Sequence, residues 1–337
     1  RYGLIMATYK EIHGTNIEVL ASDPSNPVEG QIWYNSTSNV LKGEATTAAG
    51  AWATVNSMNT ARSHLASALT GTQSAALGFG GYYPPGGGGL KADTESYNGT
   101  NWTEVNNLNL ARSALGGAGT QTAALAFGGF TYPPSTTRAE TETWNGTNWT
   151  EVNNMSTARM EMGTAGTNTS ALGFGGATPS YVAITESWNG TNWTEVNDLN
   201  TARASETGTG ADNTSALAFG GATPSVVAVT ETWNGTNWTE VNDMNTGRRD
   251  MALSIGGNNT SAIAAGGGPP FVATTEEYNG TNWVEIADIS TARGNSGGAG
   301  TVTAGLVFGG ATGPDRTAAT EEWTGAGSPV VRTFDDT

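Results

Sequence analysis

The feature that most constrains this chain is one phrase of sequence that returns six times. A tryptophan recurs in steps of 44 to 50 residues, and an arginine follows each one after ten residues. A run that ends in Gly-Gly comes next, and a Thr-Glu-x-aromatic segment completes the copy. The six tryptophans are Trp52, Trp102, Trp149, Trp193, Trp238 and Trp283. Self-similarity at this period predicts a repeat architecture, in which each unit buries its apolar face against the next unit.

Each copy predicts four short β-strands. In the copy that follows Arg203, residues 204–210 are small and polar, and residues 215–221 are apolar and end in Gly-Gly. Residues 227–234 and 236–243 both alternate apolar with polar side chains, which is typical of half-buried strands. The Asn-Gly between them predicts a tight hairpin with positive φ at both central residues, and it places an aromatic ring on each arm.

Six such units predict an all-β fold, a six-bladed β-propeller with four antiparallel strands per blade. The sheets of a propeller approach one another most closely at its axis. The first strand of each copy consists mostly of Ala, Ser and Gly, so we expect it to lie nearest the axis. The strand around Trp52 lacks the three strands that should precede it, so we expect it to complete the sixth blade beside Trp323. The alternative is that residues 328–334 fill that place.

The first 49 residues lie outside the repeat. We therefore predict an N-terminal arm and hairpin at residues 1–49 and the propeller at residues 50–337. Residues 15–20 predict a strand-like arm, and residues 32–34 and 40–41 predict the two arms of the hairpin. A simple solvated tail is the alternative for this arm. Met6 is one candidate for the start of translation, with the residues before it as an upstream extension.

Charge and composition exclude several classes of function. The chain carries 30 acidic and 14 basic side chains, a net charge of −16, which argues against nucleic acid and anionic membranes as partners. There is no window apolar and long enough for a transmembrane helix. The chain has no Cys and only two His, His13 and His64, so we expect no disulfide, no metal site and no cofactor.

The repeated charged residues are expected to be structural. A residue that occurs in every blade makes the same local interaction in each blade. We therefore predict that the six arginines pair with the six glutamates of the Thr-Glu segments. The arginines are Arg62, Arg112, Arg159, Arg203, Arg248 and Arg293, and the glutamates are Glu95, Glu142, Glu186, Glu231, Glu276 and Glu321. The sequence offers no asymmetric buried carboxylate pair, so no catalytic residue is assigned.

The order Ala-Arg, apolar-Gly-Gly, Thr-Glu-x-aromatic-Asn and Trp resembles the kelch repeat over residues 50–325. The short "NGTN" linker departs from the longer loop of many kelch proteins and looks like the kelch-like virion proteins of tailed, especially marine, bacteriophages. Residues 6–43 are similar to N-terminal regions of phage tail and fibre proteins. The resemblance implies a non-enzymatic structural or adhesion protein of the virion, tail fibre or surface-decorating, present in many copies. Residues 6–48 would bind other virion proteins.

The loops after Gly-Gly differ between copies, which is how recognition surfaces are commonly built on rigid scaffolds. A host surface polysaccharide or another virion protein is the expected ligand, although these loops can equally serve only to cover the blade ends. The candidate binding residues are Tyr82, Tyr83, Tyr132, Arg138, Tyr181 and Phe271. One alternative is a glycan-cleaving depolymerase that uses Asp93, Glu140 or Asp315. Another is a cellular kelch scaffold that binds a protein.

Overall fold

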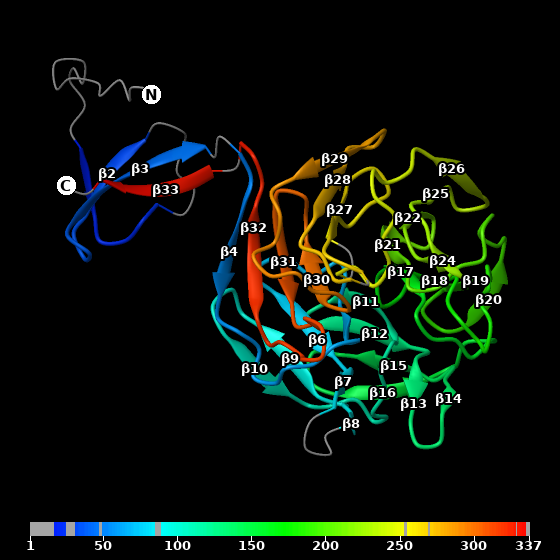
Figure 1. Cartoon of the computed structure of the whole chain (residues 1–337). Coiled ribbons are helices and arrows are strands. Elements are labelled where there is room, and N and C mark those ends of the chain that lie inside the picture. The colour runs from blue at the N-terminus through cyan, green and yellow to red at the C-terminus, as the bar shows by residue number, and fades with distance from the viewer. Residues whose placement is uncertain are drawn as a thin grey trace. The chain divides into compact units, whose positions relative to one another are not determined.

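The computed structural model describes residues 17–24, 31–46, 49–84, 89–252, 255–268, 270–327 and 329–334. It contains no helix in these ranges (Figure 1). Contacts divide the chain into two units, which are Arg1–Gly50 with Gly325–Thr337, and Ala51–Thr324. We call the first the terminal unit and the second the propeller unit.

The propeller unit is built from six antiparallel sheets, each of which runs from an inner strand to an outer strand. In that order, the first has β5 (Ala66–Ser67), β6 (Ala76–Phe79), β9 (Thr94–Tyr97) and β10 (Trp102–Val105). The second has β11 (Gly116–Thr120), β12 (Ala123–Phe127), β15 (Thr141–Trp144) and β16 (Trp149–Val152). The third has β17 (Gly163–Gly166), β18 (Ala171–Phe174), β19 (Thr185–Trp188) and β20 (Trp193–Val196).

The fourth sheet has β21 (Thr207–Asp212), β22 (Ser215–Phe219), β25 (Thr230–Trp233) and β26 (Trp238–Val241). The fifth has β27 (Ala262–Ala265), β28 (Thr275–Tyr278) and β29 (Trp283–Ile286). The sixth has β30 (Gly297–Gly300), β31 (Ala304–Phe308), β32 (Thr320–Thr324) and β4 (Ala51–Val55). Two-stranded ribbons follow three Gly-Gly pairs, namely β7 (Tyr82–Tyr83) with β8 (Gly89–Leu90), β13 (Phe130–Thr131) with β14 (Thr136–Thr137), and β23 (Ala222–Thr223) with β24 (Ser225–Val226).

The strand around Trp52 pairs with the last strand of the repeats. Trp52 lies opposite Trp323 in the β4–β32 register, so the beginning and end of the propeller unit share one sheet. The fifth sheet departs from the four-strand expectation, because an isolated bridge between Ile255 and Ile263 stands in for its inner strand among the described residues.

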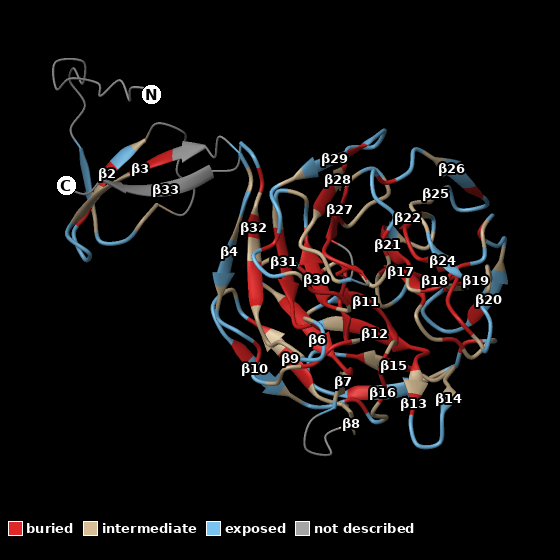
Figure 2. Cartoon of the chain, viewed as in Figure 1, coloured by how far each residue is buried: buried red, intermediate tan, exposed pale blue. Residues whose placement is uncertain are grey.

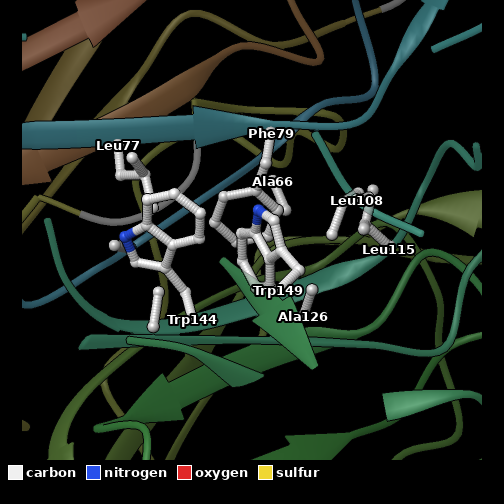
Figure 3. Packing of buried hydrophobic residues seen from close by; sticks show 10 residues of the cluster. Ala66, Leu77, Phe79, Leu108, Leu115, Ala126, Trp144 and Trp149 are labelled. Carbon is white, nitrogen blue, oxygen red and sulfur yellow. The ribbon is translucent and has the colours of Figure 1, made fainter. Parts of the chain in front are cut away.

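Aromatic rings hold each sheet to the next. Within a sheet the two rings of the repeated phrase meet across the hairpin, as Trp144 and Trp149 do with centroids 5.4 Å apart. Trp149 also contacts Phe79 of the preceding sheet at 4.9 Å, and Figure 3 shows both tryptophans facing Leu77 and Phe79. The same contact joins the sixth sheet to the first, through Phe308 and Trp102 at 4.7 Å. Figure 2 shows the buried residues concentrated on the inner and middle strands.

Small residues on the inner strands allow the sheets to approach one another at the centre. A Cβ at Gly117 would lie 2.3 Å from the carbonyl oxygen of Ser67, and one at Gly208 would lie 2.6 Å from that of Thr164. Because both obstacles are backbone atoms of the neighbouring sheet, a larger residue has no room there. This confirms the slim inner strand expected from the sequence.

The hairpin turn differs from the predicted one. Trp188 pairs with Trp193, so the connection is a four-residue loop rather than a two-residue turn. Only Gly190 has positive φ, at 90°, whereas Asn189 uses its side-chain Oδ1 to accept hydrogen bonds from the backbone N–H groups of Thr191 and Asn192. The side chain of Asn189 thus stabilises the turn, which we had predicted to depend on a positive φ at the asparagine.

Replacing Gly190 by Ala is expected to lower the free energy of unfolding by about 1–2 kcal/mol, because the new Cβ is strained at positive φ. Thermal or urea unfolding measures the change. Thr191→Ala in the same turn is the control, since the hydrogen bonds of Thr191 use its backbone N–H and its backbone carbonyl oxygen, which alanine keeps. Equal stability of the two variants would contradict the assignment of strain to φ.

The terminal unit is a small sheet in the order β1 (Glu18–Leu20), β2 (Ile32–Asn35), β3 (Val40–Thr46) and β33 (Pro329–Phe334). The expected hairpin is present as β2 and β3, and β1 pairs with β2 in parallel. Asp23 accepts hydrogen bonds from Lys42 at 2.7 Å and from the side chains of Asn35 and Trp33, and these bonds lower its pKa to about 2.

The C-terminal strand corrects the expected domain boundary. Residues 325–337 were predicted to belong to the propeller, but β33 pairs with β3 over six residues of the terminal unit. Residues 328–334 therefore do not take the outer place in the sixth sheet, where β4 lies instead. Met6 and His13 fall outside the described residues.

Candidate binding site at the propeller axis

All six repeated arginines form the predicted ion pairs. In the first sheet Arg62 lies 2.6 Å from Glu95, with both side chains fully buried. The other pairs are Arg112–Glu142, Arg159–Glu186, Arg203–Glu231, Arg248–Glu276 and Arg293–Glu321. Because each guanidinium is occupied inside its own blade, these arginines do not form an anion-binding ring.

The residue two positions after each of these arginines lies at the axis of the propeller. These residues are His64, Ala114, Glu161, Ser205, Asp250 and Asn295, and we call them the axial ring. Each has φ between 53° and 56°, a left-handed conformation that costs a side chain about 1 kcal/mol. Each backbone N–H donates to the carbonyl oxygen of the previous member, and His64 closes the cycle by donating to Asn295 at 3.0 Å. These six hydrogen bonds offset the strain.

The side chains of the axial ring border a cavity of about 50 Å³, which we call the axial cavity. Ser205 donates its hydroxyl hydrogen to Glu161 Oε2 at 3.0 Å, and Arg249 pairs with Asp250 at 3.4 Å. Burial, and then the nearby Glu161, raise the pKa of Asp250 to about 6. Burial and Arg316 lower the pKa of His64 to about 4, so this imidazole is neutral at pH 7.

Glu206 also lines the axial cavity and is only 3% exposed. The backbone N–H of Gly163 donates to its Oε1 at 3.2 Å, while its Oε2 has no hydrogen-bond partner in the described part of the chain. Burial raises the pKa of Glu206 to about 8, so the carboxyl is mostly protonated at pH 7. The equivalent repeat positions hold Leu65, Leu115, Met162 and Met251, all buried. A carboxyl thus occupies a place that most blades fill with an apolar side chain.

A second cavity of about 320 Å³, which we call the aromatic cavity, shares His64, Ala114 and Glu161 with the first. Tyr82 and Tyr132 line it, together with Leu90, Ser113, Phe130 and Met160. These residues come from the variable loops and ribbons that follow the first two Gly-Gly pairs, and from the segments beside the axial ring. The guanidinium carbon of Arg316 lies 5.8 Å from the centroid of the Tyr82 ring.

The structure brings two of the six predicted binding residues together, Tyr82 and Tyr132. Tyr83 is their half-buried neighbour in β7 and does not line the aromatic cavity. Tyr181 is 37% exposed on another loop. Arg138 is held by Thr131 Oγ1 at 2.8 Å and by Glu140 at 3.3 Å, and the Phe271 ring lies against Gly294.

The carboxylates proposed for a depolymerase are not brought together. Asp93 pairs with Lys91 at 3.9 Å and Glu140 pairs with Arg138 at 3.3 Å, and neither they nor Asp315 line the axial or the aromatic cavity. The described residues also hold no group of three side chains placed to bind a metal ion. The buried carboxyl group of Glu206 and the half-buried ones of Glu161 and Asp250 lie instead at the axis, where the sequence did not lead us to expect them.

The axial ring had a signal in the sequence, although its members were not among the predicted site residues. The two residues before the repeated arginine are nearly constant, whereas the residues after it vary, and the second of these is His, Ala, Glu, Ser, Asp and Asn in turn. Asn, Asp and His are among the residues that tolerate positive φ best, which is the physical link between this list and the left-handed backbone. Because the neighbouring positions vary as well, the sequence alone did not single out this one.

Comparison with known proteins supports the fold. No family model and no curated protein matches the sequence. Among solved structures, the one titled "Structure of YjhT" is similar over 82% of this chain and 99% of its own, with a TM-score of 0.64 and 13% identity. At that identity the likeness shows the fold alone. The class of this protein is therefore a β-propeller-like protein with six sheets. A search of the described residues finds no helix suited to crossing a bilayer.

Proposed function

We propose that this protein is a non-enzymatic adhesion component of a tailed-phage particle, a tail fibre or surface-decorating protein, which binds a host surface glycan in the aromatic cavity. The observation that carries the glycan part is the pairing of Tyr82 and Tyr132 with polar groups around about 320 Å³ of space. That volume lies at the lower end of small-ligand sites, which span about 300–1,000 Å³.

The chemistry of the aromatic cavity suits a sugar ring. The faces of Tyr82 and Tyr132 offer apolar, electron-rich surfaces for the C–H face of a pyranose. Ser113, His64 and Glu161 lie in the same lining and supply hydrogen-bonding groups for its hydroxyls. The Tyr132 side chain is 66% exposed before any ligand binds, so a sugar that covers it buries apolar area.

The resemblance of residues 6–43 to phage tail and fibre proteins supports the location on a virion. In this proposal residues 6–48 bind other virion proteins, and the propeller unit faces the host. Several copies on one particle turn weak single contacts into firm attachment, because the second and later contacts form at high effective concentration. Labelling intact particles with an antibody against the propeller unit tests this location by electron microscopy.

Replacing Tyr82 or Tyr132 by Ala is expected to weaken glycan binding about 10- to 100-fold, because each stacked ring is worth about 1–3 kcal/mol. Calorimetric titration with a panel of oligosaccharides, including fragments of host surface polysaccharide, measures the effect. Tyr181→Ala is the matched control, since Tyr181 is an exposed loop tyrosine outside the aromatic cavity.

Three results would contradict the proposal. Equal losses of glycan affinity in all three tyrosine variants would show that the glycan does not bind in the aromatic cavity. Release of new reducing ends from the polysaccharide would show an enzyme. Binding to a virion protein without any glycan binding would assign the aromatic cavity to a protein partner.

A further inference from the structure

Glu161 stands at the junction of the two cavities, because it lines both of them. Its carboxylate accepts one hydrogen bond, from Ser205 at 3.0 Å. Among the described residues it takes part in no ion pair within 4.0 Å. The six repeated glutamates of the blades, in contrast, each have an arginine. Glu161 is thus a half-buried anion without a cation partner in this part of the chain, beside a sugar-sized space.

Glu161 is the group of this junction that has no nearby cation, whereas the other charges there are balanced. Asp250 lies close enough for the Glu161 carboxylate to raise its pKa, and His64 is neutral at pH 7. Arg249 is engaged by Asp250, and Arg316 lies over the Tyr82 ring. An ammonium group placed beside Glu161 would therefore form an ion pair that none of the described residues supplies.

Glu206 supplies a second, independent sign of an unfilled site: its carboxyl is mostly protonated at pH 7, and a cation bound beside it would favour the ionised, accepting form. It is only 3% exposed, it lines the axial cavity, and its Oε2 lacks a partner in the described residues. Glu161, Ser205 and Asp250 add further acceptor oxygens to the same lining. An ammonium group carries three donors and no acceptor, so it complements a lining of this kind.

The two cavities differ in size, so each would hold a different part of a ligand that carries both a ring and an ammonium group. The axial cavity of about 50 Å³ has room for an ammonium group but not for a sugar ring. The aromatic cavity of about 320 Å³ has room for the ring, next to Tyr82 and Tyr132. Because both cavities share Glu161, a ring in the aromatic cavity can direct an amine substituent toward this carboxylate.

We propose that Glu161 makes the axial site selective for glycans that carry a protonated amine, that is, for amino sugars whose nitrogen is not acylated. This inference rests on the proposed glycan-binding function and names its ligand class. The axial ring holds the backbone of Glu161, and the hydrogen bond from Ser205 holds its carboxylate before the ligand arrives.

Glucosamine oligomers and N-acetylglucosamine oligomers of equal length test the proposal, because they share a stereochemistry and differ in charge. At pH 6 we expect the full chain to bind the amine form about tenfold or more tightly, the effect of one charge-assisted hydrogen bond. In Glu161→Gln, which keeps the shape of the side chain, this preference should disappear. Glu151→Gln, an exposed glutamate on β16, should behave like the unmodified protein.

The outcomes separate the inference from the function on which it rests. Equal binding of both oligomers, or a preference that survives in Glu161→Gln, would overturn the amine assignment and leave glycan binding intact. Failure to bind any glycan of the wider panel would overturn both. Cleavage of the oligomers would leave amine recognition standing but end the non-enzymatic proposal. A circular dichroism spectrum of Glu161→Gln that matches the unmodified protein shows that the variant is folded.

Discussion

Glu95→Gln is expected to lower the free energy of unfolding by about 3–5 kcal/mol, the usual cost of leaving one member of a buried ion pair alone. Arg62 and Glu95 are both 0% exposed and lie 2.6 Å apart. The Glu95 carboxylate also accepts from the backbone N–H of Asn59 at 2.6 Å and from that of Thr60 at 3.3 Å. A Gln side chain would present an N–H₂ group to some of these donors and leave the guanidinium charge uncompensated.

Urea unfolding of Glu95→Gln beside Glu104→Gln measures this effect. Glu104 is an exposed glutamate of the same sheet, so its change should cost less than about 0.5 kcal/mol. The double variant Arg62→Met with Glu95→Gln should recover part of the loss, because it removes the uncompensated charge. Losses of equal size at Glu95 and Glu104 would show that the buried pair contributes nothing specific.

Glu206→Met is expected to make the protein more stable, by more at pH 8 than at pH 5. The pKa of Glu206 is about 8 in the folded protein and 4.5 in the unfolded reference. Between these values the folded state holds a proton that the unfolded state has released, so stability falls as pH rises, by about 1.4 kcal/mol per pH unit. Methionine fills the same place in two other blades, as Met162 and Met251, and it carries no proton.

The measurement is the difference in unfolding free energy between Glu206→Met and the unmodified protein from about pH 5 to pH 8.5, the range that spans both pKa values. Titratable groups that both proteins share contribute equally to their stabilities, so their effects cancel in this difference. The difference should increase with pH and become constant above about pH 8. Glu195→Met, an exposed change in the neighbouring sheet, should give a difference independent of pH. If the difference in unfolding free energy for Glu206→Met does not change with pH, this carboxyl is ionised in the folded state.

The interior of the blades could be predicted because its signals are local and repeated. Asn189 and Gly190 lie within one turn, and Trp188 and Trp193 follow from the alternation of the two strands. The ion pairs were predictable for a different reason. Arginine and glutamate recur together six times, and buried charges are stable only when they are paired.

The candidate site could be predicted only in part. Tyr82 and Tyr132 were named from the variability of their loops, but nothing local indicated that these two loops, and not that of Tyr181, border one cavity. The pairing of β33 with β3 was equally hidden, because it joins opposite ends of the chain and no repeat marks it.

By itself, the sequence determined the six-sheet architecture, the aromatic contacts between sheets and the paired charges, since each needs only neighbours within one copy or the next. The tertiary structure alone decided the axial ring. Its successive members are 44 to 50 residues apart along the chain, and their left-handed backbones are stable because six hydrogen bonds between blades close into one cycle. The carboxyl of Glu161 therefore becomes part of a site only when the sheets come together around the axis.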